Sequence, residues 1–142
     1  MTWQDIKFVI SQSSARKSFF RAFQNLDYKN RVSISGQVID LGAKNGTYEY
    51  HDLISKAQGT KMTFTDLYPK ELGILKINFD KEFPIKTNTY NDALLFNVLE
   101  HVWDTRNVLS ESYRILSPGG NLYGLVPFMI RYHKDPTDYW RF

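Results

Sequence analysis

The segment VIDLGAKNGTY holds the residues whose types and spacing best suit ligand chemistry. Gly42 and Gly46 let the backbone turn without a Cβ in the way, and a helix that begins there offers unpaired N–H groups to a carboxylate or phosphate. Asp66 follows Gly42 by 24 positions, at the end of the next apolar segment, where it can accept hydrogen bonds from both hydroxyls of a ribose. This spacing indicates a site for a nucleoside-containing cofactor.

The same segment departs from the fingerprint of dinucleotide-binding proteins, which reads G-x-G-x-x-G. Lys44 stands where the second glycine belongs, and Thr47 stands where the third belongs. The sequence therefore fits an NAD-type reductase poorly.

Two histidines are candidates for proton transfer, because histidine titrates near neutral pH. His101 follows the apolar segment ALLF, and His133 lies in the loop after the last apolar segment, with Glu100 as a weaker candidate. A base is needed only where a hydroxyl must lose its proton. The structural alternatives are a histidine bonded to backbone at a helix entrance for His101 and a solvated loop for His133.

The composition excludes several other site chemistries. The chain has no cysteine, which removes disulfides, thiolate zinc sites and a cysteine nucleophile, and we expect no metal. Its 142 residues carry a net charge of +3 without a run of like charges, so binding to nucleic acid is not expected. The apolar runs are too short for a membrane span or a signal peptide. We expect a soluble, cytoplasmic protein with no membrane partner.

Strand-like and helix-like segments alternate along the chain, which predicts an α/β fold with a doubly wound, parallel sheet. Apolar residues at helical spacing predict one broken or two short helices between Trp3 and Leu26, a helix from near Thr47 to Gly59, and a helix capped by Asp104 and ended by Pro118-Gly119-Gly120. Short apolar segments predict strands over residues 37–41, 62–65, 74–79, 93–96 and 122–127.

In such a sheet, ligands bind outside the carboxyl ends of the strands, where the strand order reverses. Asp40 with the glycine turn, Asp66, Asp80 and Asn97 all end or follow expected strands. We therefore expect these polar side chains to gather at one edge of the sheet.

Five segments, in this order and spacing, resemble the motifs of class I S-adenosylmethionine-dependent methyltransferases of the small-molecule type. They are DLGAKNG, TFTDLYP, the end of LKINFD, LLFNVLEHVWD and YRILSPGGNLYGLVPF. The closing HKDPTDYWRF is similar to a stretch in relatives linked to sugar and cell-surface polysaccharide biosynthesis. The resemblance covers residues 37–142 and implies a Rossmann-like domain over residues 36–142, with strand order 3-2-1-4-5, preceded by a helical segment over residues 1–35 that packs on the sheet.

The resemblance also implies which residues bind S-adenosyl-L-methionine. Asp40 and the turn from Gly42 to Gly46 would hold its methionine part, Asp66 its ribose and Asp80 its adenine, while Asn97 would line the methionine end. The implied cofactor-binding set is Asp40, Gly42, Ala43, Lys44, Gly46, Asp66, Leu67, Phe79, Asp80, Asn97 and Val98. The implied activity is methyl transfer to a small-molecule acceptor, which the sequence does not identify beyond a sugar or polysaccharide precursor.

Two features depart from that family. Lys44 replaces the middle glycine of G-x-G-x-G, and if this position requires a positive φ, a lysine there costs on the order of 1 kcal/mol. The family's sheet continues beyond the fifth strand with a helix and a strand pair, which we expect this chain to lack. The exposed edge of the fifth strand would then favour association of two copies. The alternative function is a non-catalytic module that binds S-adenosylmethionine or a nucleoside and acts through association.

Overall fold

A five-stranded, all-parallel sheet forms the centre of this computed structural model, which describes residues 1–14, 17–44, 46, 48–127 and 136–140. The strand order is β5-β4-β2-β6-β7, which in chain order is the expected 3-2-1-4-5. Its strands are β2 (Gln37–Asp40), β4 (Lys61–Asp66), β5 (Leu75–Lys76), β6 (Tyr90–Phe96) and β7 (Leu116–Leu125). The Rossmann-like parallel fold predicted from the sequence is confirmed.

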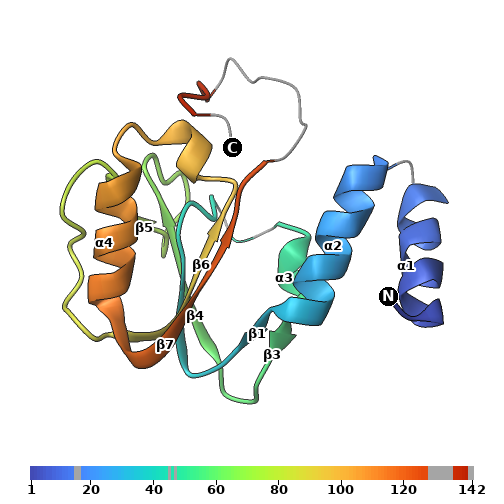
Figure 1. The fold of residues 1–142 in the computed structure, drawn as a ribbon. Helices are drawn as coiled ribbons and strands as arrows, with labels where there is room; N and C mark the ends of the chain where they lie inside the picture. The colour runs from blue at the N-terminus through green and yellow to red at the C-terminus, as the bar shows by residue number, and fades with distance from the viewer. Residues whose placement is uncertain (15–16, 45, 47, 128–135, 141–142) are drawn as a thin grey trace.

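The two central strands, β2 and β6, are buried on both faces. Neighbouring residues of a strand point to opposite faces, so Ile39, Ala93 and Leu95 pack in one apolar cluster while Val38 and Leu94 pack in the other. Helix α4 (Thr105–Ile115) contributes to the first cluster, and α2 (Phe19–Arg31) and α3 (Tyr50–Leu53) contribute to the second. Figure 1 shows α4 on one face of the sheet and α2 and α3 on the other.

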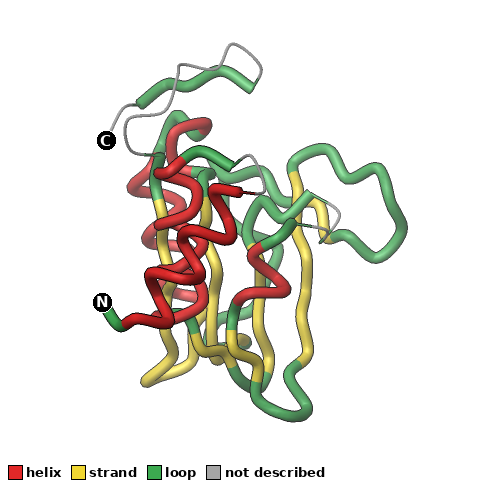
Figure 2. The backbone as a smooth tube through the Cα atoms, turned by 90° about the vertical axis from the view of Figure 1, so that its right-hand side faces the viewer, coloured by secondary structure: helices red, strands yellow, loops and turns green. Residues whose placement is uncertain are grey.

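The N-terminal region forms two helices, α1 (Trp3–Ser14) and α2, as one of the two sequence alternatives predicted. Helix α2 begins at Ser18, whose hydroxyl accepts a hydrogen bond from the backbone N–H of Arg21. Val9 of α1 packs on Ala22 and Leu26 of α2, and α1 lies on the side of α2 away from the sheet (Figure 1). Figure 2 shows these helices in front of the strands, which run side by side.

The helix predicted from near Thr47 to Gly59 is wrong in length, because the structure has only the four-residue α3 there. Ile54 already has extended backbone, and β3 (Ser55–Lys56) follows it directly. This strand pairs in parallel with β1 (Ser33–Ile34) to form a separate two-stranded sheet. Pairing with β1 satisfies the backbone of residues that helical spacing alone had assigned to α3.

The ends of the third and fifth predicted strands also differ from the structure. The third strand, β5, covers two residues rather than residues 74–79.

Helix α4 is capped by the Asp104 carboxylate as predicted, but it ends at Ile115, before Pro118-Gly119-Gly120. Strand β7 begins at Leu116 and contains this sequence, which lies at an irregularity in the ladder where Tyr90 pairs with Leu116 and Asp92 pairs with Asn121. The prolyl-glycine pair therefore forms a bulge and not a helix stop.

The connection between β5 and β6 is held against α4 by hydrogen bonds to Glu111 and Arg114, which form an ion pair within the helix. Arg114 donates to both carboxylate oxygens of Glu111, at 2.8 and 2.6 Å, and also to the carbonyl oxygens of Phe83 and Ile85. Glu111 in turn accepts the backbone N–H of Phe83 at 2.7 Å. The hydrogen bonds from Arg114 lower the pKa of the Glu111 carboxyl.

No helix among the described residues is long and apolar enough to cross a membrane.

Candidate functional site

A cavity of about 530 Å³ opens at the carboxyl edge of the sheet, where the sequence places the polar residues. Its walls come from α2, from the turn after β2, from the ends of β6 and β7, and from the short 3-10 helix η1 (Leu99–His101). The lining residues are Lys17, Arg21, Asn25, Tyr28, Gly42, Tyr48, Glu49, Tyr50, Phe96, Asn97, Glu100, His101 and Pro127. Its volume is in the range of small-molecule sites.

The turn after β2 is fixed by a threonine of the neighbouring strand. The Thr65 hydroxyl donates to the Asp40 carbonyl at 3.0 Å and accepts the Gly42 backbone N–H at 3.2 Å. Gly42 has a φ of 81°, and a Cβ on it would meet a methyl group of Val98 at 2.6 Å. The glycine is therefore required by backbone conformation and by the protein's own packing.

Lys44 has the positive φ for which we predicted a steric cost of lysine. Its φ is 57°, in the left-handed region that side chains rarely occupy, and its side chain is exposed. The backbone of this position is thus the one a glycine would adopt, although the residue is a lysine.

Asp40 lies at the centre of a buried hydrogen-bond network beneath the cavity. Its Oδ2 accepts the Tyr50 hydroxyl at 2.8 Å and lies 2.6 Å from Nε2 of His51. The other ring nitrogen of His51 lies 3.0 Å from the Tyr48 carbonyl oxygen. Burial, followed by the charge of Asp40, raises the pKa of the Tyr50 hydroxyl far above its ordinary value. The Oδ1 atom of Asp40 is buried and has no hydrogen-bond partner among the described residues.

Asp66 lies at the same sheet edge as the turn after β2 but is not among the residues that line the cavity. Burial and then the charges of Asp66 and Asp40 raise the pKa of the Tyr48 hydroxyl. A Cβ on Gly46 would meet the Phe64 ring at 2.9 Å, which packs the turn against the end of β4. The structure therefore brings the glycine turn and Asp66 together at adjacent strand ends.

Asp80 is exposed and lies outside the cavity lining. Its carboxylate accepts the backbone N–H of Asp104 at 3.0 Å, just before α4. Phe79 and Val98 are core residues, Ala43 is fully buried, and Leu67 is half-buried. None of these five lines the cavity.

Asn97 and His101 line the same cavity as Gly42. Asn97 follows β6 with a φ of 54°, and its backbone N–H donates to Leu125 of β7 at 2.8 Å. The His101 ring is close to residues 137 and 138, which are more than thirty positions further along the chain. His133 lies outside the described residues.

The wall formed by α2 was not predicted as part of the site. Arg21, Asn25 and Tyr28 follow one another at i, i+4 and i+7, which places them on one face of the helix. This spacing was the available signal, although nothing in the sequence shows which partner the face meets. Burial raises the pKa of the Tyr28 hydroxyl to about 12, so it is a neutral hydrogen-bonding group at physiological pH.

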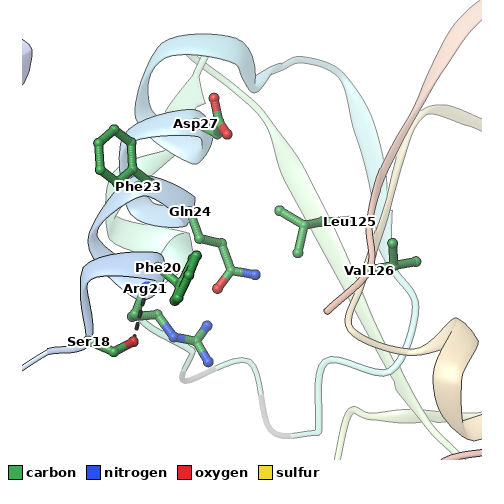
Figure 3. A pocket seen from close by; sticks show the side chains of 8 residues that line it. All are labelled: Ser18, Phe20, Arg21, Phe23, Gln24, Asp27, Leu125 and Val126. Carbon is green, nitrogen blue, oxygen red and sulfur yellow. Dashed lines mark hydrogen bonds between the residues drawn. The ribbon is translucent and has the colours of Figure 1, made fainter. Parts of the chain in front are cut away.

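A smaller cavity of about 370 Å³ lies between α2 and the end of β7 (Figure 3). Phe20, Phe23 and Gln24 of α2 form one wall, and Leu125 and Val126 lie opposite them. Arg21 lines both cavities.

Comparison with protein families identifies residues 14–142 as matching a methyltransferase domain family. The chain belongs to this methyltransferase family. The match covers the sheet, α2 and every candidate site residue. A comparison with curated proteins finds no match.

Two solved structures resemble this methyltransferase domain. One is a SAM-dependent methyltransferase from Aquifex aeolicus, with 17% identity and a TM-score of 0.46 over 58% of this chain and 51% of that chain. The other is a Haloferax volcanii complex between the Trm112 methyltransferase activator and a methyltransferase, with 20% identity and a TM-score of 0.44 over 65% of this chain and 45% of that chain. The chain spans about half the length of each.

Membership of this family implies S-adenosylmethionine as the methyl donor, and the residues present fit it. The unpartnered Oδ1 of Asp40 is an acceptor that the amino group of a methionine, or a water bound to it, would satisfy. The cavity is large enough for part of such a ligand, and its walls carry amide, hydroxyl and carboxylate groups. No group of acidic and histidine side chains suited to a metal ion occurs among the described residues.

Proposed function

We propose that this domain transfers the methyl group of S-adenosylmethionine to a small-molecule acceptor bound in the 530 Å³ cavity. The observation that carries the proposal is the convergence of Gly42, Asn97 and His101 on this one cavity, in a chain of the methyltransferase family. Their segments are far apart in the sequence and meet only because parallel strands end at a common edge.

We propose that the cofactor lies along this edge in the way that the family resemblance implies. We assign its ribose hydroxyls to Asp66 and its adenine amino group to Asp80, while Asp40, Asn97 and the turn containing Gly42 would hold the methionine part. When bound, the cofactor supplies a methyl carbon made electrophilic by a positively charged sulfur. The protein then has to align the acceptor and exclude water, and most of the acceleration can come from these two effects.

The acceptor that we propose is a sugar or a polysaccharide precursor. Polar groups from α2 and η1 line the cavity, including Arg21, Asn25, Tyr28 and Glu100. Such a wall suits a ligand rich in hydroxyl groups better than an apolar one. Because Arg21 also lines the smaller cavity, it is our candidate for the contact that selects the acceptor.

The division of labour within the chain is also a proposal. Residues 36–142 would bind the cofactor, and residues 1–35 would close the acceptor side through α2. We place the domain in the cytoplasm, without nucleic-acid or membrane partners. We also propose association of copies through the outer edge of β7, which pairs with no other strand in the described part of the chain.

Titration calorimetry with S-adenosylmethionine tests the first step, and we expect saturable 1:1 binding. Release of S-adenosylhomocysteine is then measured with panels of hydroxyl, amine and thiol acceptors. Absence of cofactor binding contradicts the proposed function. Binding without product formation for any acceptor favours the non-catalytic module instead.

A further inference from the structure

The segment 136–140 lies against η1, which carries two residues of the cavity wall. The backbone N–H of Tyr139 donates to the Glu100 carbonyl at 2.6 Å, and the Trp140 indole N–H donates to the Val102 carbonyl at 2.8 Å. Figure 1 shows this segment above the carboxyl ends of the strands. These contacts fix the segment beside η1 without involving the His101 side chain.

The same segment supplies two oxygen atoms to one nitrogen of the His101 ring. Nδ1 of His101 lies 3.1 Å from the Thr137 carbonyl oxygen and 3.2 Å from Oδ1 of Asp138. The Asp138 side chain is 3% exposed, so it faces the ring and not the solvent. A carbonyl oxygen can only accept a hydrogen bond, which requires the proton to be on Nδ1.

A neutral imidazole protonated on Nδ1 has its lone pair on Nε2. This is the arrangement in which a carboxylate orients a histidine to take a proton and then faces the positive charge that the ring acquires. His101 lines the cavity together with Asn97 and Gly42, and its Nε2 lies 3.7 Å from Oε1 of Glu100. The ring is therefore placed at the cavity with its second nitrogen basic.

We propose that Asp138 is a positioning residue that holds His101 as the base for a hydroxyl acceptor. The proposal rests on the proposed methyltransferase function. In the step, Nε2 of His101 takes the hydroxyl proton, the oxygen electron pair forms the bond to the methyl carbon, and the electrons of the broken carbon–sulfur bond remain on sulfur. The charge of the sulfonium thus passes to the imidazolium, beside the Asp138 carboxylate. An amine could attack with its own lone pair before losing a proton, so this pair of residues points to oxygen as the methylated atom.

The experiment is ¹⁵N NMR of the histidine-labelled full chain, with the His101 signals assigned by their loss in His101→Gln. We expect the Nδ1–H tautomer of His101 in the wild type. In Asp138→Ala the Thr137 carbonyl is still an acceptor for Nδ1, but the carboxylate is gone, so the share of the Nδ1–H tautomer should fall. In Asp138→Asn the amide oxygen should restore that share. Backbone amide spectra show whether each variant is folded. If Asp138→Ala does not fold, Asp138→Asn still allows a comparison with the wild type.

An Nε2–H tautomer in the wild type overturns the proposal, as does an unchanged share of the Nδ1–H tautomer in a folded Asp138→Ala. The acceptor identified in the screen should be a hydroxyl compound, and an amine or thiol acceptor overturns the assignment of oxygen. Calorimetry separates failure of the role proposed for Asp138 from failure of the proposed function. Both Asp138 variants should bind S-adenosylmethionine with a dissociation constant within twofold of the wild type.

Discussion

Nε2 of His51 lies 2.6 Å from Oδ2 of Asp40, and both side chains are buried beneath the cavity. The same oxygen of Asp40 also accepts the Tyr50 hydroxyl. Consecutive residues of α3 therefore hold the acidic residue that ends β2. The contact joins the core of the sheet to the floor of the site, so it bears on both stability and binding.

Asp40→Ala should lower the free energy of unfolding by about 3 kcal/mol, because it leaves the Tyr50 hydroxyl and a His51 ring nitrogen buried without an acceptor. Tyr50→Phe removes only one donor and should cost about 1 kcal/mol. Urea unfolding measures both. Equal losses in the two variants would show that Asp40 is not the centre of the network.

Asp66→Ala should weaken S-adenosylmethionine binding tenfold or more, on the order of 1.4 kcal/mol, through loss of charge-assisted hydrogen bonds to the ribose. Calorimetry gives the dissociation constant. Asp52→Ala is the matched control, since Asp52 is an exposed acid of α3 that is not assigned any contact with the cofactor. An unchanged constant for Asp66→Ala would remove Asp66 from the cofactor site.

Lys44→Gly should stabilise the fold, by up to about 1 kcal/mol, because glycine adopts a φ of 57° without the steric cost that lysine bears. We also expect a lower dissociation constant for S-adenosylmethionine, because the turn after β2 would adopt its conformation without strain. Lys56→Gly is the comparison, since it removes an exposed lysine from extended strand backbone and should destabilise. Loss of stability in Lys44→Gly would contradict the strain assigned to this position.

Glu111→Gln should cost about 2 kcal/mol at neutral pH, because it removes the carboxylate that holds Arg114 and Phe83. The folded pKa of Glu111 is lowered, so its contribution is present above the ordinary value of 4.5 and is lost as the pH falls through the folded value. Unfolding free energies between pH 3 and pH 7 should therefore fall less steeply on the acid side for the variant.

The control for this comparison is Asp27→Asn, which breaks the exposed ion pair between Asp27 and Arg31. We expect a change of no more than about 0.5 kcal/mol, since exposed pairs contribute little. If the unfolding free energy falls equally steeply at acid pH in the wild type and in Glu111→Gln, the result would contradict the role assigned to Glu111.

The order of the strands could be predicted from the sequence because buried parallel strands are short, nearly continuous apolar runs, and because a family resemblance covered all five. The length of α3 could not. Ser55 and Lys56 pair with a two-residue strand that has no pattern of its own, so tertiary pairing overrode helical spacing. Pro118-Gly119 was misjudged for a related reason, since these residues suit a bulge as well as a helix stop.

The site was predictable where it depends on strand ends and unpredictable where it depends on packing between distant segments. Gly42, Asn97 and His101 line one cavity because the topology places strand ends together. Tyr28 comes to the cavity from a helix that precedes the sheet, and Asp138 comes from the far end of the chain. No local pattern shows that Asp138 is buried beside a histidine.

Parallel pairing also decides when this chain can begin to fold. The backbone N–H of Gln37, in β2, donates to the side chain of Asn91, in β6, across 54 positions. All strand pairs of the central sheet are parallel within the described residues. Each pairing must therefore close a long loop before its contacts stabilise the chain, which makes folding slow. During synthesis the β6-facing edge of β2 therefore stays open until residue 96 has left the ribosome. A nascent chain stalled before that point would expose an unpaired strand edge, and such edges favour aggregation.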